Sequence, residues 1–312
     1  MPPTDGAAVK LLCITPNPAL DRTLTVPGFT PGGISRTGDV LLAAGGKGLN
    51  VARAARTLGV EVWCLGILAG HTGRLFADLA EDEGLPSAWT WGDGETRVCT
   101  IIVSEDGATV VNEQGLPLHP ELWQRFTADV LAHTDEVDVV CVSGSYPPGI
   151  SAENVAQWFR ALADSGKHVW IDSSGMALGA ALETSGINIK VNGDEIGAAL
   201  GCSASDVTSA ADAAFQARQR TGGAVVVTLG KLGAVMVTAE GRYTAHPPDI
   251  PITSDVGSGD SFLAALAISG ATPEGLRRAV AAGTANALSV GGGQFSLQDF
   301  KRVLVGTTVS VV

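Results

Sequence analysis

The sequence predicts an α/β protein with a doubly wound, mostly parallel sheet flanked by helices, and with a small β-sheet lid. Three observations support this fold class. Short, nearly continuous apolar runs recur along the chain, as is typical of strands that are buried on both faces of a parallel sheet. Segments with helical periodicity separate these runs, so strands and helices alternate. Two other segments, 19–44 and 96–112, alternate polar and apolar residues around turns and are predicted to be hairpins.

The predicted core strands follow one another at intervals that leave room for helices. They are, in chain order, 10–15 (KLLCIT), 60–68 (VEVWCLGIL), 137–144 (VDVVCVSG), 167–172 (KHVWID), 187–192 (INIKVN) and 224–230 (AVVVTLG). An amphipathic stretch at 151–165 is typical of the intervening helices, with Ser151 and Asn154 in its first turn. Ligands of such sheets bind at the carboxyl ends of the strands, so we expect the functional site there.

No repeat, low-complexity segment or linker divides the chain, which predicts a single domain over residues 1–312. The two hairpins, at approximately 19–44 and 96–112, interrupt the α/β alternation. Hairpins inserted in this way can form a side sheet that closes over the active cleft.

Composition excludes several classes of protein. Of the 312 residues, 45% are hydrophobic and 17% are charged, which allows a sizeable core and argues against disorder. The net charge of −12 argues against a nucleic-acid partner. No apolar run reaches the roughly 18 residues of a membrane span, and no signal peptide is evident, so we expect a cytoplasmic protein without a membrane partner. The five cysteines are widely spaced and are predicted to be reduced thiols: Cys13, Cys64, Cys99, Cys141 and Cys202.

Residues 255–270 (DVGSGDSFLAALAISG) carry the strongest local signal. Gly257, Ser258 and Gly259 lead directly into an apolar helix, whose unpaired backbone N–H groups and dipole form an anion site. Such a site suits the charge that builds on a transferring phosphoryl group. Asp260 stands in the same turn and can be either a catalytic carboxylate or only a helix cap. The two glycines and the serine before it favour the catalytic interpretation.

A second pattern is the strand end at Asn192, followed three residues later by Glu195. An amide and a carboxylate on one face of a first helical turn can hold Mg²⁺, usually through water, near nucleotide phosphates. The same spacing is typical of a helix-capping pair, and taken alone this interpretation is favoured.

The stretch LLAAGGKGLN, residues 41–50, superficially suggests a phosphate-binding P-loop. That pattern needs a first glycine where Leu41 stands and a hydroxyl residue where Gly48 follows Lys47. The P-loop interpretation therefore fails, and the glycines need another explanation. A strand–turn–strand segment at 225–237 and the NPALD stretch ending at Asp21 are weaker signals, each compatible with ordinary turns.

Taken together, these stretches resemble the ribokinase-like PfkB family of sugar kinases. The resemblance rests on six ordered motifs that span most of the chain: T-x-N-P-x-x-D (15–21), G-G-K-G-L-N (45–50), S-G-S-x-P-x-G (143–149), N-x-x-E (192–195), L-G-x-x-G-A (229–234) and G-S-G-D-S (257–261). It is nearest to the branch that acts on phosphorylated ketohexoses, which holds 1-phosphofructokinases and tagatose-6-phosphate kinases.

The resemblance implies a role for each matching residue. Asp260 would be the base that deprotonates the sugar hydroxyl, with an anion hole from Gly257, Ser258 and Gly259. ATP and Mg²⁺ would be the cofactors. The residues implied for them are Lys190 at the ATP phosphates, Asn192 and Glu195 at the Mg-ATP site, and Thr228, Gly230 and Gly233 along the nucleotide.

The resemblance also implies a site for the sugar phosphate. Asp21 and Asn50 would bind sugar hydroxyls, and Gly46 would belong to a sugar-binding turn. Lys47 and Arg97 would read the substrate's phosphate, with Arg36 as a third candidate cation. Ser143 and Ser145 could add hydroxyl groups.

The function implied is transfer of the γ-phosphoryl of ATP to a ketohexose monophosphate, first of all fructose 1-phosphate, giving fructose 1,6-bisphosphate. Tagatose 6-phosphate is the alternative substrate. A sugar-phosphate-binding protein on a kinase scaffold is an alternative of another class, against which the intact Asp260 argues. Lids of this kind sometimes pair between subunits, so a homodimer is one assembly to test.

Overall fold

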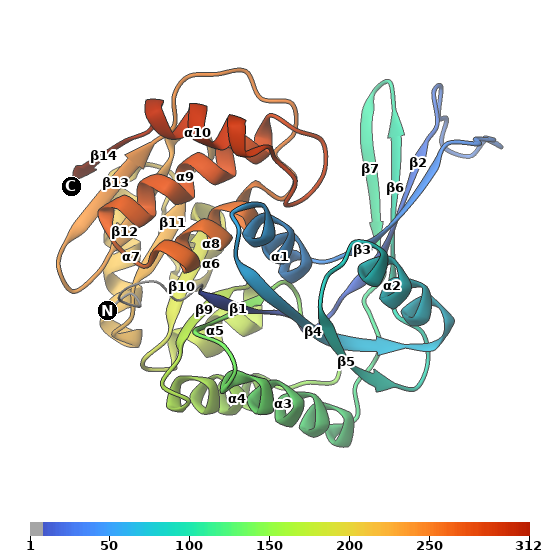
Figure 1. Ribbon diagram of the computed structural model, residues 1–312, viewed down its shortest axis with the longest axis horizontal. Coiled ribbons are helices and arrows are strands. Elements are labelled where there is room, and N and C mark those ends of the chain that lie inside the picture. The colour runs from blue at the N-terminus through green and yellow to red at the C-terminus, as the bar shows by residue number, and fades with distance from the viewer. Residues whose placement is uncertain (1–8) are drawn as a thin grey trace.

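The computed structural model describes residues 9–312 and contains a ten-stranded main sheet in the order β14-β13-β12-β11-β10-β9-β8-β1-β4-β5 (Figure 1). Its strands are β1 (Lys10–Thr15), β4 (Glu61–Ala69), β5 (Ser87–Gly92), β8 (Val139–Ser143), β9 (His168–Asp172), β10 (Asn188–Asn192), β11 (Val225–Thr228), β12 (Ala234–Val237), β13 (Arg242–His246) and β14 (Thr308–Val311). In the spatial order of this sheet, every pair of neighbours from β5 across β4, β1, β8, β9 and β10 to β11 is parallel. The strands β12, β13 and β14 then add antiparallel neighbours beyond β11. The predicted mostly parallel sheet is confirmed, and β5, β13 and β14 are strands that the sequence reading did not foresee.

Two layers of helices cover the main sheet. One face packs against α1 (Lys47–Thr57), α2 (Gly70–Asp82), α8 (Ser258–Ser269), α9 (Pro273–Ala287) and α10 (Leu297–Gly306). The other face packs against α3 (Pro120–Thr134), α4 (Ala152–Asp164), α5 (Gly175–Leu182), α6 (Gly193–Leu200) and α7 (Val207–Thr221). Helix α4 begins with a Ser151–Asn154 capping box, where the sequence predicted a first turn.

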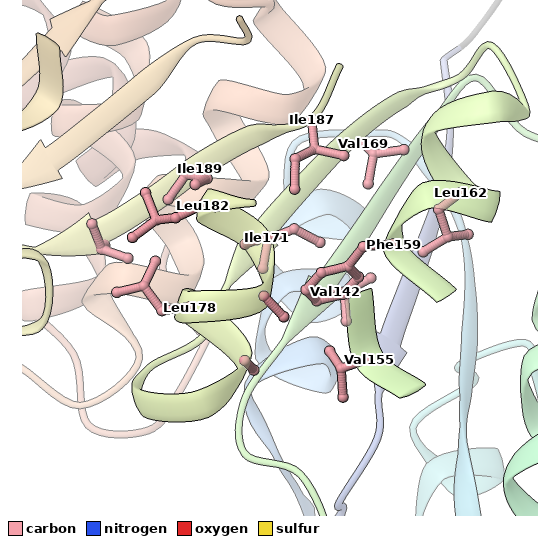
Figure 2. Packing of buried hydrophobic residues seen from close by; sticks show 14 of the residues in the cluster. Val142, Val155, Phe159, Leu162, Val169, Ile171, Leu178, Leu182, Ile187 and Ile189 are labelled. Atoms are coloured by element: carbon pink, nitrogen blue, oxygen red, sulfur yellow. The ribbon is translucent and has the colours of Figure 1, made fainter. Parts of the chain in front are cut away.

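Alternation along each strand explains why the core strands are apolar without interruption. In β8, Val140 and Val142 face one helical layer, whereas Val139 and Cys141 face the other. Figure 2 shows Val142 packed close to Phe159 of α4. Because both faces are covered, both sets of alternate positions are mostly apolar, and polar residues gather where the strands end. Lys190 in the middle of β10 is an exception, and its charge is paired with Asp172.

The two predicted hairpins form one four-stranded sheet, here called the small sheet. Its order is β3-β2-β6-β7, with β2 (Ala19–Thr25), β3 (Val40–Gly45), β6 (Val98–Ser104) and β7 (Gly107–Asn112). Each hairpin is antiparallel, and β2 joins them by pairing in parallel with β6. Figure 1 shows β2, β6 and β7 extending beyond the helices of the main body. The small sheet is therefore covered far less than the main sheet.

Four cysteines are buried as predicted, whereas Cys202 is exposed, and all five are free thiols. No helix within residues 9–312 is both long and apolar enough to cross a bilayer.

Candidate active site

Residues predicted from separate motifs meet where the parallel strands of the main sheet end. Asn192 ends β10 and lies beside Thr228, which ends β11. Helices α1 and α8 pack against each other. A hydrogen bond from Asn50 Nδ2 to Asp260 Oδ2, 2.8 Å long, joins the first turns of these two helices. The sheet edge and the two helix starts thus form one polar cluster.

Asp260 is nearly enclosed, with 5% of its surface exposed. Burial and the negative charge of Asp172 raise the pKa of Asp260 to about 6, against the opposing charges of Lys47 and Lys190. Helix α8 has no side-chain cap, and the Asp260 carboxylate accepts its hydrogen bond from Asn50 instead. This geometry argues against a capping role. A carboxylate with a pKa near 6 is ionised at neutral pH and accepts a proton more readily than an ordinary Asp.

Asp172 is a central residue that the sequence reading missed. It ends β9 with no exposed surface, and its two oxygens lie 3.3 Å from Lys47 Nζ and 2.9 Å from Lys190 Nζ. Burial alone would raise the pKa of Asp172, but the two lysines outweigh it and hold the pKa below its ordinary value. The charge of Asp172 in turn raises the pKa of Lys47. The available signal was a polar residue at the end of a predicted strand, the same signal that identified Asn192.

Gly259 lets a buried cation approach the start of α8. A Cβ at this position would lie only 2.8 Å from Lys190 Nζ, so any larger residue would displace the ammonium group. The Ser258 N–H donates to the Asp255 carbonyl within the turn, at 3.1 Å. In the described part of the chain, the N–H groups of Gly257 and Gly259 have no such partner. Lys190 and these two N–H groups therefore concentrate positive potential beside Asp260.

Asn286 fixes the conformation of this turn and was also missed. Its Nδ2 donates to the Val256 carbonyl at 2.7 Å, and its Oδ1 accepts from the Ser261 hydroxyl at 3.1 Å. The residue is completely buried in α9. One side chain thus ties the turn before α8 to the first turn of α8, which keeps Asp260 in place.

Asp21 lies on the small sheet, at the pairing position opposite Cys99 of β6. Burial raises the pKa of Asp21 to about 6, and the charges of Arg53 and Arg97 partly offset it. Arg53 also donates to Asn50 Oδ1 at 2.9 Å and pairs with Glu83, which holds the Asn50 amide with Nδ2 toward Asp260. Arg53 was not predicted, and it links the Asp21 side of the cluster to the catalytic side.

The turn before α1 explains the glycines that suggested a P-loop. Gly46 has a φ of 126°, and a Cβ there would come within 2.7 Å of the Thr15 methyl group. These glycines bring the chain close to the end of β1. Lys47 follows with 41% of its side chain exposed, and its ammonium group remains accessible beside Asp172.

Arg97 stands at the base of the small sheet, immediately before β6. Its Nε donates to the Asn17 carbonyl at 3.1 Å and its Nη1 to the Glu113 carbonyl at 3.2 Å. The Asn17 amide donates to the Ser145 hydroxyl at 3.2 Å, so Arg97 and Ser145 lie on either side of Asn17. Burial lowers the pKa of Arg97, which still stays charged at any working pH.

Ser143 ends β8 at the position that pairs with Asp172, the last residue of β9. It is completely buried, and its hydroxyl has no hydrogen-bond partner within residues 9–312. Ser143 therefore lies beside the cluster but is closed to solvent. Arg36 is exposed in the connection between β2 and β3, outside any helix or strand.

Asn192 and Glu195 form a capping box at the start of α6. Asn192 Oδ1 accepts from the Glu195 N–H at 2.8 Å, and Glu195 Oε2 accepts from the Asn192 N–H at 2.9 Å. The negative charge of Glu195 adds to that of Asp172 in raising the pKa of Lys47. Glu195 therefore lies close enough to interact with the Asp172–Lys47 pair. Within residues 9–312 no group of three or more His, Cys, Asp or Glu residues could hold a metal by itself. Any ion there would need ligands from a bound molecule or water.

The predicted nucleotide residues continue along the same edge. The Thr228 hydroxyl donates to the Val191 carbonyl at 3.3 Å. Gly230 and Gly233 bound the short turn between β11 and β12, with φ values of 56° and 89°. Both φ values lie in the left-handed region that favours glycine, which explains the two glycines of this turn.

Comparisons with known proteins identify the family. The model of the pfkB family carbohydrate kinases matches residues 14–293. The 1-phosphofructokinase of Rhodobacter capsulatus is 36% identical over 288 residues, covering 91% of this chain and 90% of its own. That of Escherichia coli K12 is 33% identical over 258 residues, covering 82% and 83%. The chain belongs to the PfkB family of carbohydrate kinases.

A solved PfkB-type neighbour agrees with the fold. The crystal structure of phosphofructokinase-2 from Escherichia coli in complex with potassium has a TM-score of 0.88 and 29% identity, covering 96% of this chain and 99% of that one. The predicted family and the ribokinase-like fold are confirmed. Membership among carbohydrate kinases implies ATP as the phosphoryl donor and small molecules as the substrates.

Proposed function

We propose that this PfkB protein transfers the γ-phosphoryl group of ATP to fructose 1-phosphate, giving fructose 1,6-bisphosphate and ADP. The observation that carries the proposal is the buried Asp260 carboxylate, held by Asn50 at the start of α8 and close to the Lys190 ammonium group. A binding protein has no need of a buried carboxylate with a raised pKa at such a position. Relatives named 1-phosphofructokinase at 33–36% identity support the choice of substrate.

Asp260 would act as the general base. The hydroxyl oxygen on C6 of the sugar attacks the γ-phosphorus, the bond to the β–γ bridging oxygen breaks, and ADP leaves with that electron pair. The hydroxyl proton passes to the Asp260 carboxylate as the new P–O bond forms. Lys190 and the N–H groups of Gly257 and Gly259 would stabilise the charge on the transferring group.

Mg²⁺ fits the nucleotide side of this site. Glu195 Oε1 has no hydrogen-bond partner within residues 9–312, while Oε2 is held by the capping box. Mg²⁺ commonly uses one or two carboxylates together with substrate phosphates and waters. Glu195, with Asn192 through water, would hold the ion, which neutralises phosphate charge when bound. The capping box would keep the Glu195 side chain in one orientation.

Lys47 and Arg97 would select a substrate that already carries a phosphate. Both cations lie on the sugar side of the cluster. Since the chain as a whole has a net charge of −12, two cations in one place form a local site that favours an anionic substrate. Nη2 of Arg97 makes no hydrogen bond within residues 9–312, whereas Nε and Nη1 are fixed by backbone carbonyls. The guanidinium is thus oriented in advance and keeps one donor for a phosphate oxygen.

We expect a strong preference for phosphorylated ketohexoses. With ADP release as the assay, kcat/KM for fructose 1-phosphate should exceed that for free fructose by at least ~100-fold, which corresponds to about 2.7 kcal/mol. Fructose 6-phosphate and tagatose 6-phosphate belong in the same panel. Equal turnover of free fructose would contradict the role of the two cations, and a higher kcat/KM for tagatose 6-phosphate would replace the proposed substrate.

Replacing Arg97 with Ala should raise KM for fructose 1-phosphate by roughly tenfold and leave KM for ATP nearly unchanged. The physical reason is that Arg97 lies beside Asn17 and Ser145, on the sugar side of the cluster. Arg36→Ala is a matched control, because Arg36 is exposed away from the cluster. If the ATP constant moved instead, Arg97 would belong to the nucleotide site.

The small sheet supports a homodimer as the assembly. Leu41 of β3 and Val110 of β7 are 65% and 51% exposed. The cross-strand register runs from Leu41 through Thr23 and Ile101 to Val110, so all four side chains lie on the same face of the small sheet. Exposed apolar rows of this kind are typical of interfaces. In sedimentation equilibrium, the wild type should have about twice its chain mass of 31.7 kDa. Leu41→Glu combined with Val110→Glu should reduce it to the monomer mass, and a monomeric wild type would contradict the proposal.

A further inference from the structure

A cavity lies at the opposite end of the main sheet from the candidate active site. It has a volume of about 580 Å³ and reaches the first residues of three parallel strands: Val139 of β8, His168 of β9 and Asn188 of β10. The active-site residue Asp172 is the last residue of β9, four positions beyond His168, which is about 13 Å along a strand. The cavity is thus separate from the kinase site. Its volume falls within the range of small-molecule pockets.

Apolar and aromatic groups form one side of this cavity. Tyr243 of β13 and Ile268, near the carboxyl end of α8, are half-buried and line the cavity together with Ala267. Trp170 also borders the cavity but is only 2% exposed, so it offers little surface. Tyr243 and Ile268 offer an apolar surface that suits the body of a planar ligand.

Arg218 provides the charge in the cavity. It lies in the last turn of α7. Figure 1 shows α7 on the side of the molecule away from the small sheet. Its Nε is enclosed and has no hydrogen-bond partner, and its side chain forms no ion pair within residues 9–312. A buried donor without a partner is unfavourable and calls for an explanation such as an absent ion or water. Because Nε is closed to solvent while the residue as a whole is half-buried, a ligand in the cavity would meet the charge of Arg218 at its terminal nitrogens.

The other charged groups around the cavity leave Arg218 available. Glu240 is fully exposed at the rim and lies more than 4.0 Å from any Arg218 nitrogen, since no ion pair joins them. A hydrogen bond from Thr238, more than the charge of Arg218, holds the pKa of Glu240 below its ordinary value. Helix α9 begins at the cavity with Thr272 and Pro273, so its positive dipole end adds to the potential of Arg218.

We propose that this cavity is a second ligand site, which binds a small planar organic anion with its apolar ring against Tyr243 and Ile268 and its acidic group on Arg218. The chemistry that defines the ligand is a carboxylate, sulfonate or phosphate attached to an aromatic or similarly flat body. The site is distinct from the sites for ATP and the sugar phosphate.

Calorimetry with two matched probes tests the proposal. Naphthalene-1-sulfonate carries the anion, and naphthalene-1-sulfonamide has the same ring without the charge. The full chain is titrated with the active site filled by a non-hydrolysable ATP analogue and fructose 1-phosphate. We expect one sulfonate site per chain and at least ~10-fold weaker binding of the sulfonamide, as expected for loss of a charge-assisted hydrogen bond.

Three variants locate the site. Arg218→Met should weaken sulfonate binding about tenfold and leave sulfonamide binding unchanged. Arg220→Met, an exposed arginine of the same helix outside the cavity, should bind like the wild type. Ala271→Phe, which fills the cavity, should abolish binding of both probes, and it serves independently if Arg218→Met does not fold. Three results would each overturn the proposal. The first is that sulfonate binding does not saturate, and the second is that the active-site ligands displace the sulfonate. The third is that wild type, Arg218→Met and Ala271→Phe bind it with equal affinity.

Discussion

Replacing Asp260 with Asn should lower kcat by roughly 10²–10⁴, the usual contribution of a positioned base. The amide keeps the size of the side chain and can remain next to Asn50, but it cannot accept the proton of the sugar hydroxyl. KM for both substrates should change little, because the groups proposed to bind them are untouched. Steady-state kinetics measures this, with Asp82→Asn, an exposed change at the end of α2, as the control for loss of one charge. Normal turnover of the Asp260→Asn protein would remove Asp260 as the base.

Thermal stability gives an independent check on the same variant. The folded-state pKa of Asp260 is raised from 3.8 to about 6, so the ionised group destabilises the fold at neutral pH. That cost is relieved as the pH falls from about 6 to about 4, where folded Asp260 is protonated. Asp260→Asn should therefore melt at or above the wild-type temperature at pH 7.5, with an upper limit of about 3 kcal/mol of added stability. A lower melting temperature would indicate a structural role.

The pH dependence of kcat should show the same group. Wild-type kcat should fall on the acid side of about pH 6, because protonated Asp260 cannot act as a base. Asp21 has a pKa of about 6 as well, but it is placed at the sugar and should affect KM more than kcat. The residual kcat of Asp260→Asn should lack the acid limb.

Replacing Asp172 with Asn should destabilise the protein by about 3–5 kcal/mol, because it leaves buried cations without their counter-charge. Lys190 is 4% exposed and has Asp172 as its ion-pair partner, and Lys47 shares the other carboxylate oxygen. Since ionised Asp172 also fixes Lys190 beside Gly259, kcat should fall together with the melting temperature. Denaturant unfolding and steady-state kinetics measure the two effects.

A double substitution separates this charge effect from simple loss of packing. In Asp172→Asn combined with Lys190→Met, the more deeply buried cation is removed with its partner, so much of the lost stability should return while activity stays low. Asp82→Asn again serves as the exposed control. If Asp172→Asn unfolds at the wild-type denaturant concentration, the carboxylate does not stabilise the two lysines as described.

Local patterns in the sequence were sufficient for most of the fold. The uninterrupted apolar runs predicted β1, β4 and β8 to β11, because strands covered on both faces need apolar residues at every position. Polar–apolar alternation around turns predicted both hairpins of the small sheet. The strands β13 and β14 escaped prediction, since each is short and the two pair with each other across more than 60 residues of sequence, as in Tyr243 with Val311.

Within the site, the sequence by itself determined which glycine-rich turns and strand ends carry the chemistry, including Asp260, Lys47 and Asn192. Only the tertiary structure decided how their charges are balanced. Asp172 meets Lys47 125 residues away, Arg53 meets Glu83 30 residues away, and Asn286 meets Ser261 25 residues away. No local pattern in the sequence shows which of these partners come together. The same holds for Arg36 and Arg97, two arginines of the same small-sheet region: folding places one in solvent and the other against Asn17, because long-range pairing of β2 with β6 sets the base of that sheet.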